Sequence, residues 1–97
     1  MQRSTIESIG EVIAQMLRDS GLEKPLMEKQ LVESWPVVMG PSVTRLTRRV
    51  ELKNGILYVY LNSAALKAEL FICRRELVTK LNDHVGSKVI DEVRLLG

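Results

Sequence analysis

Apolar residues recur at steps of three and four near the start of the chain, which predicts a one-sided helix over residues 1–22. Residues 4–7 read Ser-Thr-Ile-Glu and fit a capping box, in which a hydroxyl and a carboxylate satisfy amides of the first turn. Gly21 is a candidate for the left-handed residue that ends many helices. The apolar stripe consists of Ile6, Ile9, Ile13, Met16 and Leu17.

A second stripe, from Leu26 onward, predicts a second helix. Pro36 lacks a backbone donor and disfavours helical geometry at Trp35, so this helix either stops there or kinks for one more turn. Gly40-Pro41 ends the helix in both cases. Trp35 lies on the apolar stripe and is expected to pack against a sheet. The other members of the stripe are Met27, Leu31 and Val38.

From residue 45 onward the apolar pattern changes from steps of three and four to alternation, which is the period of a strand. Residues 45–52 and 56–61 flank Asn54-Gly55, a dipeptide that favours the positive φ angles of a tight hairpin turn. A two-residue turn fixes the register, because a slip by one residue would exchange the two faces of the sheet. The pairs expected on the buried side are Leu52–Leu57 and Val50–Val59, and those on the outer side are Lys53–Ile56, Glu51–Tyr58 and Arg49–Tyr60.

A third helix is expected to begin at Ser63, which is a suitable N-cap, and to run to about residue 83 or 84 before Gly86. Residues 88–95 then predict a short last strand. If the third helix is unbroken, this strand runs parallel to the second strand of the hairpin, but the pattern leaves open which strand it joins. The stripe of the third helix is Leu66, Leu70, Cys73, Leu77 and Leu81, widened by Phe71 and Val78.

The order helix, helix, strand, strand, helix, strand predicts an α+β fold with a small three-stranded sheet packed on helices. Ninety-seven residues suffice for one core but not for two, so residues 1–97 are expected to form a single domain. The 45% apolar and 27% charged fractions are close to those of soluble globular chains. No apolar run approaches the roughly 18 residues that a membrane span needs, and no signal-peptide core is present, which favours a cytoplasmic location.

Few residues are suited to catalysis. One cysteine and one histidine cannot form a disulfide framework or a four-ligand zinc site within the chain. Cys73 lies on a predicted buried stripe, where a thiol behaves as a small apolar residue. His84 falls at a helix C-terminus, where capping or solvent exposure is expected. With no nucleophile and base in a recognisable pairing, we expect no enzymatic activity, no metal and no cofactor.

Charge divides the chain unevenly. Residues 1–40 hold four basic and six acidic side chains, whereas residues 41–80 hold eight basic and three acidic ones. The outer side of the hairpin combines cations with rings, which suits the phosphates and unstacked bases of a single strand. The same surface also fits a protein partner, with Ile56, Tyr58 and Tyr60 as apolar anchors, or a solvated surface without a partner. The candidate nucleic-acid-binding residues are Arg45, Arg49, Lys53, Tyr58 and Tyr60 on the sheet side and Arg74 and Arg75 on the helix side.

Several short motifs follow one another in a recognisable order. Trp35 precedes Val-Val-Met-Gly at residues 37–40, and the hairpin follows at residues 54–59. The third helix opens with Ser-Ala-Ala-Leu-Lys-Ala-Glu-Leu at residues 63–70. Together these motifs resemble the bacterial DciA-like family, with residues 26–97 as the best-matching part. The remaining matches are Thr44, Leu77, Leu81-Asn82, Gly86, Val89-Ile90 and Val93.

The resemblance implies a KH-like module that contacts the replicative DNA helicase, helps to load it and binds DNA, in many members with a basic disordered tail. Two features depart from that pattern. Leu66 stands where family members commonly have tryptophan, and the Gly-x-x-Gly clamp of KH domains is missing.

The leading hypothesis is therefore a non-enzymatic replication domain that associates with the replicative helicase and binds single-stranded DNA weakly. An RNA-binding module using the same surface is the first alternative. A protein-binding adaptor that forms a homodimer through Ile56 and Tyr58 is the second.

Overall fold

The computed structural model describes residues 11–13, 15, 16, 21 and 23–97. Residues 11–13 and 15–16 are helical, and Gly21 has a φ of 76°, as the predicted left-handed cap requires. The capping box predicted at residues 4–7 lies outside the described residues.

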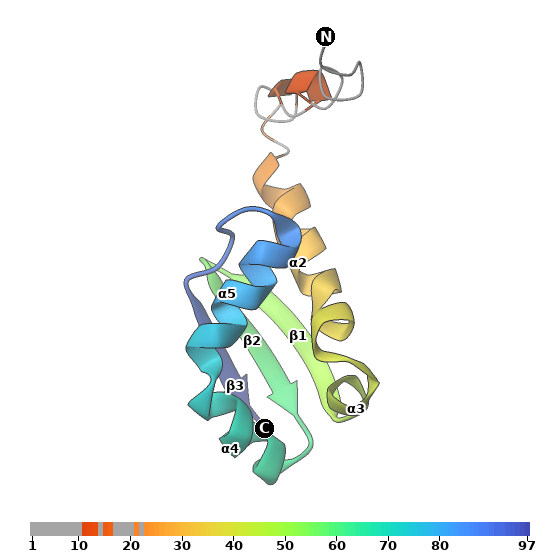
Figure 1. Cartoon of the computed structure of the whole chain (residues 1–97), viewed down its shortest axis with the longest axis vertical. Helices are drawn as coiled ribbons and strands as arrows, with labels where there is room; N and C mark the ends of the chain where they lie inside the picture. Colours follow the sequence, from red (N-terminus) through yellow and green to blue (C-terminus); the bar gives the residue numbers. More distant parts are fainter. Residues whose placement is uncertain (1–10, 14, 17–20, 22) are drawn as a thin grey trace, which may run out of the picture.

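The described elements form an α+β domain, which confirms the predicted class. Strand β2 lies in the centre of a three-stranded sheet, antiparallel to β1 and parallel to β3 (Figure 1). The last strand runs parallel to β2, the direction expected for an unbroken third helix, although that helix is interrupted; its neighbour is β2. The KH-like topology that the resemblance implies is compatible with this order and stays a prediction. The elements are α2 (Glu23–Met39), α3 (Pro41–Arg45), β1 (Thr47–Lys53), β2 (Ile56–Leu61), α4 (Ala64–Ile72), α5 (Arg74–Val85) and β3 (Glu92–Leu96).

Helix α2 continues past Pro36 for one more turn, the second of the two outcomes expected from the sequence. The amide of Gly40 donates to the carbonyl of Pro36 at 3.0 Å and closes this turn. Gly40 then adopts a φ of 85°, and Pro41 opens the short helix α3, because its fixed φ suits a first helical turn. The predicted start of the first strand at Arg45 was wrong. Arg45 is the last residue of α3, and β1 begins at Thr47.

The hairpin register is confirmed at all five predicted pairs, from Lys53–Ile56 to Arg49–Tyr60. Asn54 and Gly55 both have positive φ, 51° and 78°, as a primed turn requires. One irregularity was not foreseen. The register shifts between Thr47 and Arg49, so that Arg48 is an extra residue on β1, as in a β-bulge.

The predicted third helix is interrupted at Cys73, where φ is −104° and ψ is 22°. The bend lets α4 contact β2 and β3, while α5 packs against α2 and β3. Ser63 caps α4 as predicted, its hydroxyl accepting from the amide of Leu66 at 3.1 Å. Phe71 does not widen the buried stripe: its side chain is 54% exposed beside the break.

The last strand begins at Glu92 rather than at residue 88. Gly86 ends α5 in the left-handed conformation, and the side chain of Asn82 then binds the backbone of the next segment. Its Nδ2 donates to the carbonyl of Ile90 at 2.9 Å, and its Oδ1 accepts from the amides of Val89 and Ile90 at 2.9 and 3.1 Å. These bonds take the place of strand pairing at residues 89 and 90.

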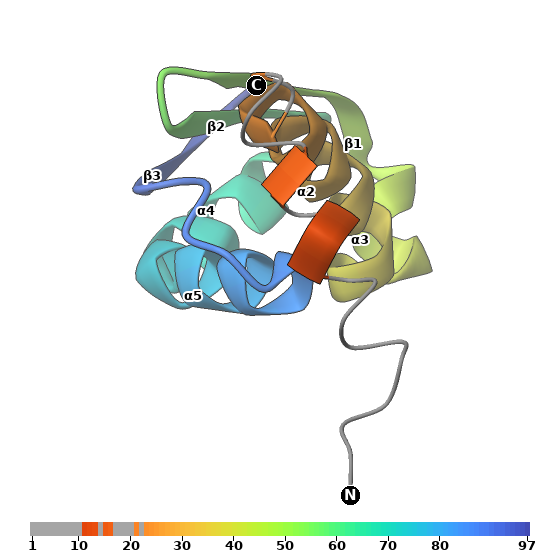
Figure 2. The same cartoon turned by 90° about the horizontal axis from the view of Figure 1, so that it is seen from above.

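The helices cover one face of the sheet, and the described residues leave the other face open (Figure 2). Trp35 is 1% exposed between the two layers, and its Nε1 donates to the hydroxyl of Thr47 at 3.2 Å. Its predicted packing role is confirmed. The buried apolar core comprises Leu31, Trp35, Leu57, Val59, Leu61, Leu70, Leu77, Leu81, Ile90, Val93 and Leu95.

We expect Asn82→Ala to lower the free energy of unfolding by about 2 kcal/mol, because it removes three hydrogen bonds and leaves half-buried backbone groups unpaired. Urea denaturation measures the change. Asp83→Ala, at the exposed neighbouring position, is the matched control and should change stability by less than about 0.5 kcal/mol. Equal values for the two variants would contradict the structural role of Asn82.

Candidate nucleic-acid interface

The open face of the sheet is formed by side chains that alternate with the buried ones. Leu57 and Val59 of β2 and Val93 and Leu95 of β3 point into the core, so the residues between them point away from it. We call this surface the outer face. It consists of three cross-strand rows: Arg49–Tyr60–Leu96, Glu51–Tyr58–Arg94 and Lys53–Ile56–Glu92.

An arginine lies over each tyrosine ring of the outer face. The guanidinium carbon of Arg49 is 4.3 Å from the centroid of the Tyr60 ring, and that of Arg94 is 5.7 Å from the Tyr58 ring. Both distances are within the range of cation–π attraction. Both tyrosines are half-buried, so their rings are held in place by the strand and remain accessible to solvent.

The same arginines are paired with carboxylates. Arg49 Nε lies 3.2 Å from Glu51 Oε2, and Arg94 Nε donates to Glu92 Oε2 at 2.7 Å. The hydrogen bond and the charge of Glu92 raise the pKa of Arg94 above its ordinary value. The nine residues of the outer face hold three cations and two carboxylates, which gives a modest positive charge.

The structure brings together four of the seven residues proposed from the sequence: Arg49, Lys53, Tyr58 and Tyr60. Arg45 does not join them, because it belongs to α3 instead of β1. Arg94 joins the outer face without having been predicted. The sequence did not identify Arg94 as a residue of this face, because the neighbour of the last strand could not be inferred from the sequence.

Arg74 and Arg75 lie at the start of α5, in the helical layer, and therefore on a different surface from the tyrosines. Arg74 lies over the Phe71 ring at 4.0 Å, and its Nη1 donates to the carbonyl of Phe71 at 2.8 Å. Ile72 is 82% exposed beside them. We call Phe71, Ile72, Arg74 and Arg75 the α4–α5 corner.

Cys73 and His84 are the single cysteine and the single histidine of the chain. Cys73 is half-buried and packs against the core, and His84 is exposed near the end of α5. No three His, Cys, Asp or Glu side chains of the described residues come close enough to hold a metal ion. The described helices include none that is both long and apolar enough to cross a membrane.

The fold and this face together define a two-layer α+β domain that presents arginine-stacked tyrosines on an open sheet. The family model described as "Dna[CI] antecedent, DciA" matches residues 8–95, so the chain belongs to the DciA family. The family resemblance inferred from the sequence motifs is thereby confirmed.

Relatives of this chain include proteins of Corynebacterium and Mycobacterium. It is 24% identical over 91 residues to a UPF0232 protein of Corynebacterium glutamicum, an alignment that covers 94% of this chain and 51% of the relative. UPF0232 proteins of Mycobacterium bovis and Mycobacterium tuberculosis are 23% identical over 91 residues, covering 94% of this chain and 49% of each relative. The chain thus spans about half the length of the curated relatives it matches.

The two faces of β2 should respond differently to substitution. Leu57→Ala should lower the free energy of unfolding by about 2–5 kcal/mol, because it leaves a cavity in the core. Tyr60→Thr introduces a β-branched side chain, which suits a strand, and removes a ring from the outer face, and it should cost less than about 1 kcal/mol. Urea denaturation compares the two variants. A loss at Tyr60 as large as that at Leu57 would show that the ring is a core residue.

Proposed function

We propose that this domain is a non-enzymatic accessory module of DNA replication. In this proposal it associates with the replicative DNA helicase and binds single-stranded DNA weakly through the outer face. Membership of the DciA family supports the connection to replication. The observation that supports DNA binding most directly is the stacking of Arg49 on Tyr60 and of Arg94 on Tyr58 on a face that no described helix covers.

The outer face suits a single strand better than a duplex. Tyrosine rings and guanidinium planes offer flat surfaces on which unstacked bases can lie, and the cations attract the backbone phosphates. A flat, open sheet has no projecting helix or ribbon to enter a major groove. Stacking and phosphate attraction read little base identity, so we expect little sequence preference.

The paired carboxylates account for weak binding. A phosphate approaching Arg49 or Arg94 must compete with Glu51 or Glu92, each of which is already in contact with its arginine. Lys53 has no ion pair among the described residues and is the cation most readily available. Binding should therefore be measurable at low salt and fall as salt rises.

We assign the helicase contact to the α4–α5 corner, which leaves the outer face to DNA. An exposed isoleucine and phenylalanine flanked by arginines resemble the apolar centre and arginine-rich edge of protein interfaces. Because the corner and the outer face lie on different layers of the fold, both partners can bind at once.

The DNA-binding part is tested with fluorescence anisotropy of a labelled poly-dT oligonucleotide between about 50 and 200 mM salt. Tyr60→Thr should weaken binding by at least about fivefold, because a stacked base contributes about 1 kcal/mol or more. Arg49→Gln should reduce the slope of log affinity against log salt by about 0.7, the value of one phosphate contact.

Lys29→Gln is the control for Arg49→Gln, since it removes one positive charge from an exposed position on α2. An affinity that does not change with salt, or equal losses in Arg49→Gln and Lys29→Gln, would refute DNA binding through the outer face. Parallel titration with a matched RNA strand tests the alternative, because only a site that contacts the 2′-hydroxyl should prefer RNA.

The helicase-binding part is tested with Ile72→Glu, which places a charge at the most exposed apolar residue of the corner. We expect co-purification with the replicative helicase to fall by at least about tenfold, because burying an unpaired charge opposes association. DNA binding should be unchanged. The reverse result, with DNA binding lost and the helicase retained, would contradict the assignment of the two surfaces.

A further inference from the structure

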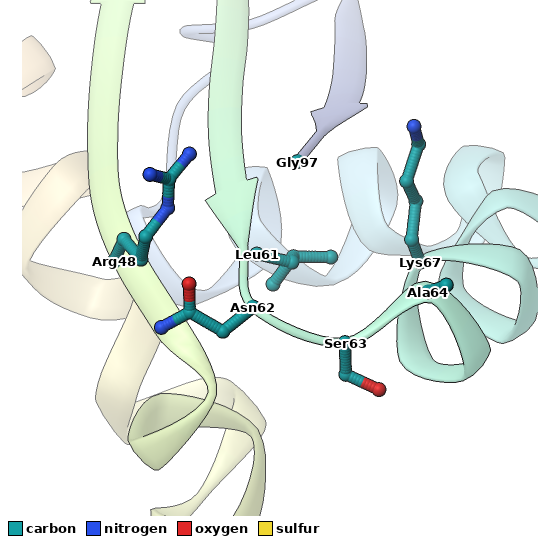
Figure 3. Close-up of a pocket in the computed structure, with 7 residues that line it drawn as sticks. All are labelled: Arg48, Leu61, Asn62, Ser63, Ala64, Lys67 and Gly97. Atoms are coloured by element: carbon teal, nitrogen blue, oxygen red, sulfur yellow. The ribbon is translucent and has the colours of Figure 1, made fainter.

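A basic depression lies beside the outer face, where the ends of three elements meet (Figure 3). Its volume is about 480 Å³. Arg48 comes from β1, Asn62 from the link after β2, and Lys67 from the first turns of α4. None of the described side chains that line it is acidic. The remaining lining residues are Leu61, Ser63, Ala64 and Gly97.

The β-bulge accounts for the position of Arg48. Thr47 pairs with Leu61 and Arg49 pairs with Tyr60, so Arg48 is left without a cross-strand partner of its own. An extra residue bends the strand and re-aims the side chain at that point. Without the bulge, strict alternation would turn Arg48 toward the core; with it, Arg48 is exposed at the rim of the depression.

The two cations here differ from the two arginines of the outer face, each of which contacts a carboxylate. Among the described residues, neither Arg48 nor Lys67 forms an ion pair or has a side-chain hydrogen bond. Figure 3 shows the two side chains flanking the depression and extending in the same direction, with the amide of Asn62 turned toward Arg48. Two unpaired cations on either side of an open depression attract an anion that lies between them.

The depression adjoins the outer face at Arg48. Arg48 lines a second hollow of about 270 Å³ together with Arg49 and Tyr60. One arginine thus borders both the tyrosine that we assign to base stacking and the basic depression. A strand whose base lies on Tyr60 would pass its backbone over Arg48.

The capped N-terminal end of α4 contributes little by itself to the binding of an anion. The Ser63 hydroxyl accepts from the amide of Leu66, and the Ser63 carbonyl accepts from the amide of Lys67 at 3.0 Å. The backbone amide of Asn62 donates to the carbonyl of Leu46 at 2.8 Å. This bond fixes the link between β2 and α4 and leaves the side chain of Asn62 available. Recognition therefore depends on the side chains of Arg48, Asn62 and Lys67.

We propose that this depression binds a backbone phosphate of the single DNA strand whose base stacks on Tyr60. The inference rests on the proposed function and adds to it a phosphate site and two residues, Arg48 and Lys67. It also gives the bound strand a path, from the tyrosines across the bulge toward the start of α4.

The test measures poly-dT binding by anisotropy as a function of salt for Arg48→Gln and Lys67→Gln. Each variant should bind about two- to fivefold more weakly at the lowest salt and reduce the salt slope by about 0.7. Lys67→Arg keeps the charge and should retain the wild-type slope. Lys80→Gln, which removes a charge from an exposed position on α5, is the matched control and should leave the slope unchanged.

The outcomes separate the two proposals. If Tyr60→Thr weakens binding while Arg48→Gln and Lys67→Gln behave like Lys80→Gln, the phosphate site is wrong and the outer face remains the binding surface. If the wild-type domain does not bind the oligonucleotide at the lowest salt, both proposals are overturned. Far-ultraviolet circular dichroism of each variant verifies that the compared proteins are folded.

Discussion

The alternation of residues along β2 is the constraint on which the rest of the structure depends. Leu57, Val59 and Leu61 enter the core between the sheet and the helices, and the intervening Tyr58 and Tyr60 must therefore face outward. The Asn54-Gly55 turn fixes the register of β1 against this strand, which places Arg49 beside Tyr60. Burial of one face of β2 thus determines which residues lie on the other face. A slip by one residue would expose the core leucines and bury the tyrosines, so the candidate interface cannot be separated from the stability of the sheet.

Electrostatic pairing explains why two kinds of basic surface occur side by side. On the outer face, Glu51 and Glu92 hold Arg49 and Arg94 near their rings and moderate the positive charge. At the bulge, Arg48 has no such partner among the described residues and faces Lys67 across an open depression. The first arrangement orients guanidinium groups for stacking, whereas the second offers unneutralised charge. A single strand can use both, since its bases project from a backbone that carries the charged phosphates.

Much of this fold was predictable because its determinants are local. Period-two alternation and the Asn-Gly turn predicted the hairpin register, and Ser63 and Gly86 marked the ends of the helical region that they enclose. Features set by distant contacts were missed. The break at Cys73 follows from the need of α4 and α5 to reach different parts of the fold, and the late start of β3 follows from the hydrogen bonds of Asn82. The candidate site divides in the same way: the residues on the hairpin were identified, but Arg94 depends on the position of β3, and Arg48 depends on a bulge.

The most direct test of the account is an NMR titration of the ¹⁵N-labelled domain with a short single-stranded DNA, read as a map of amide chemical-shift changes. If DNA binds to the outer face and the depression, as the account proposes, the changes concentrate on β1 and β2 around Arg49 and Tyr60 and extend through Arg48 to the start of α4 at Lys67. Changes confined to the α4–α5 corner and the exposed side of α2, with the hairpin amides unaffected, would contradict it.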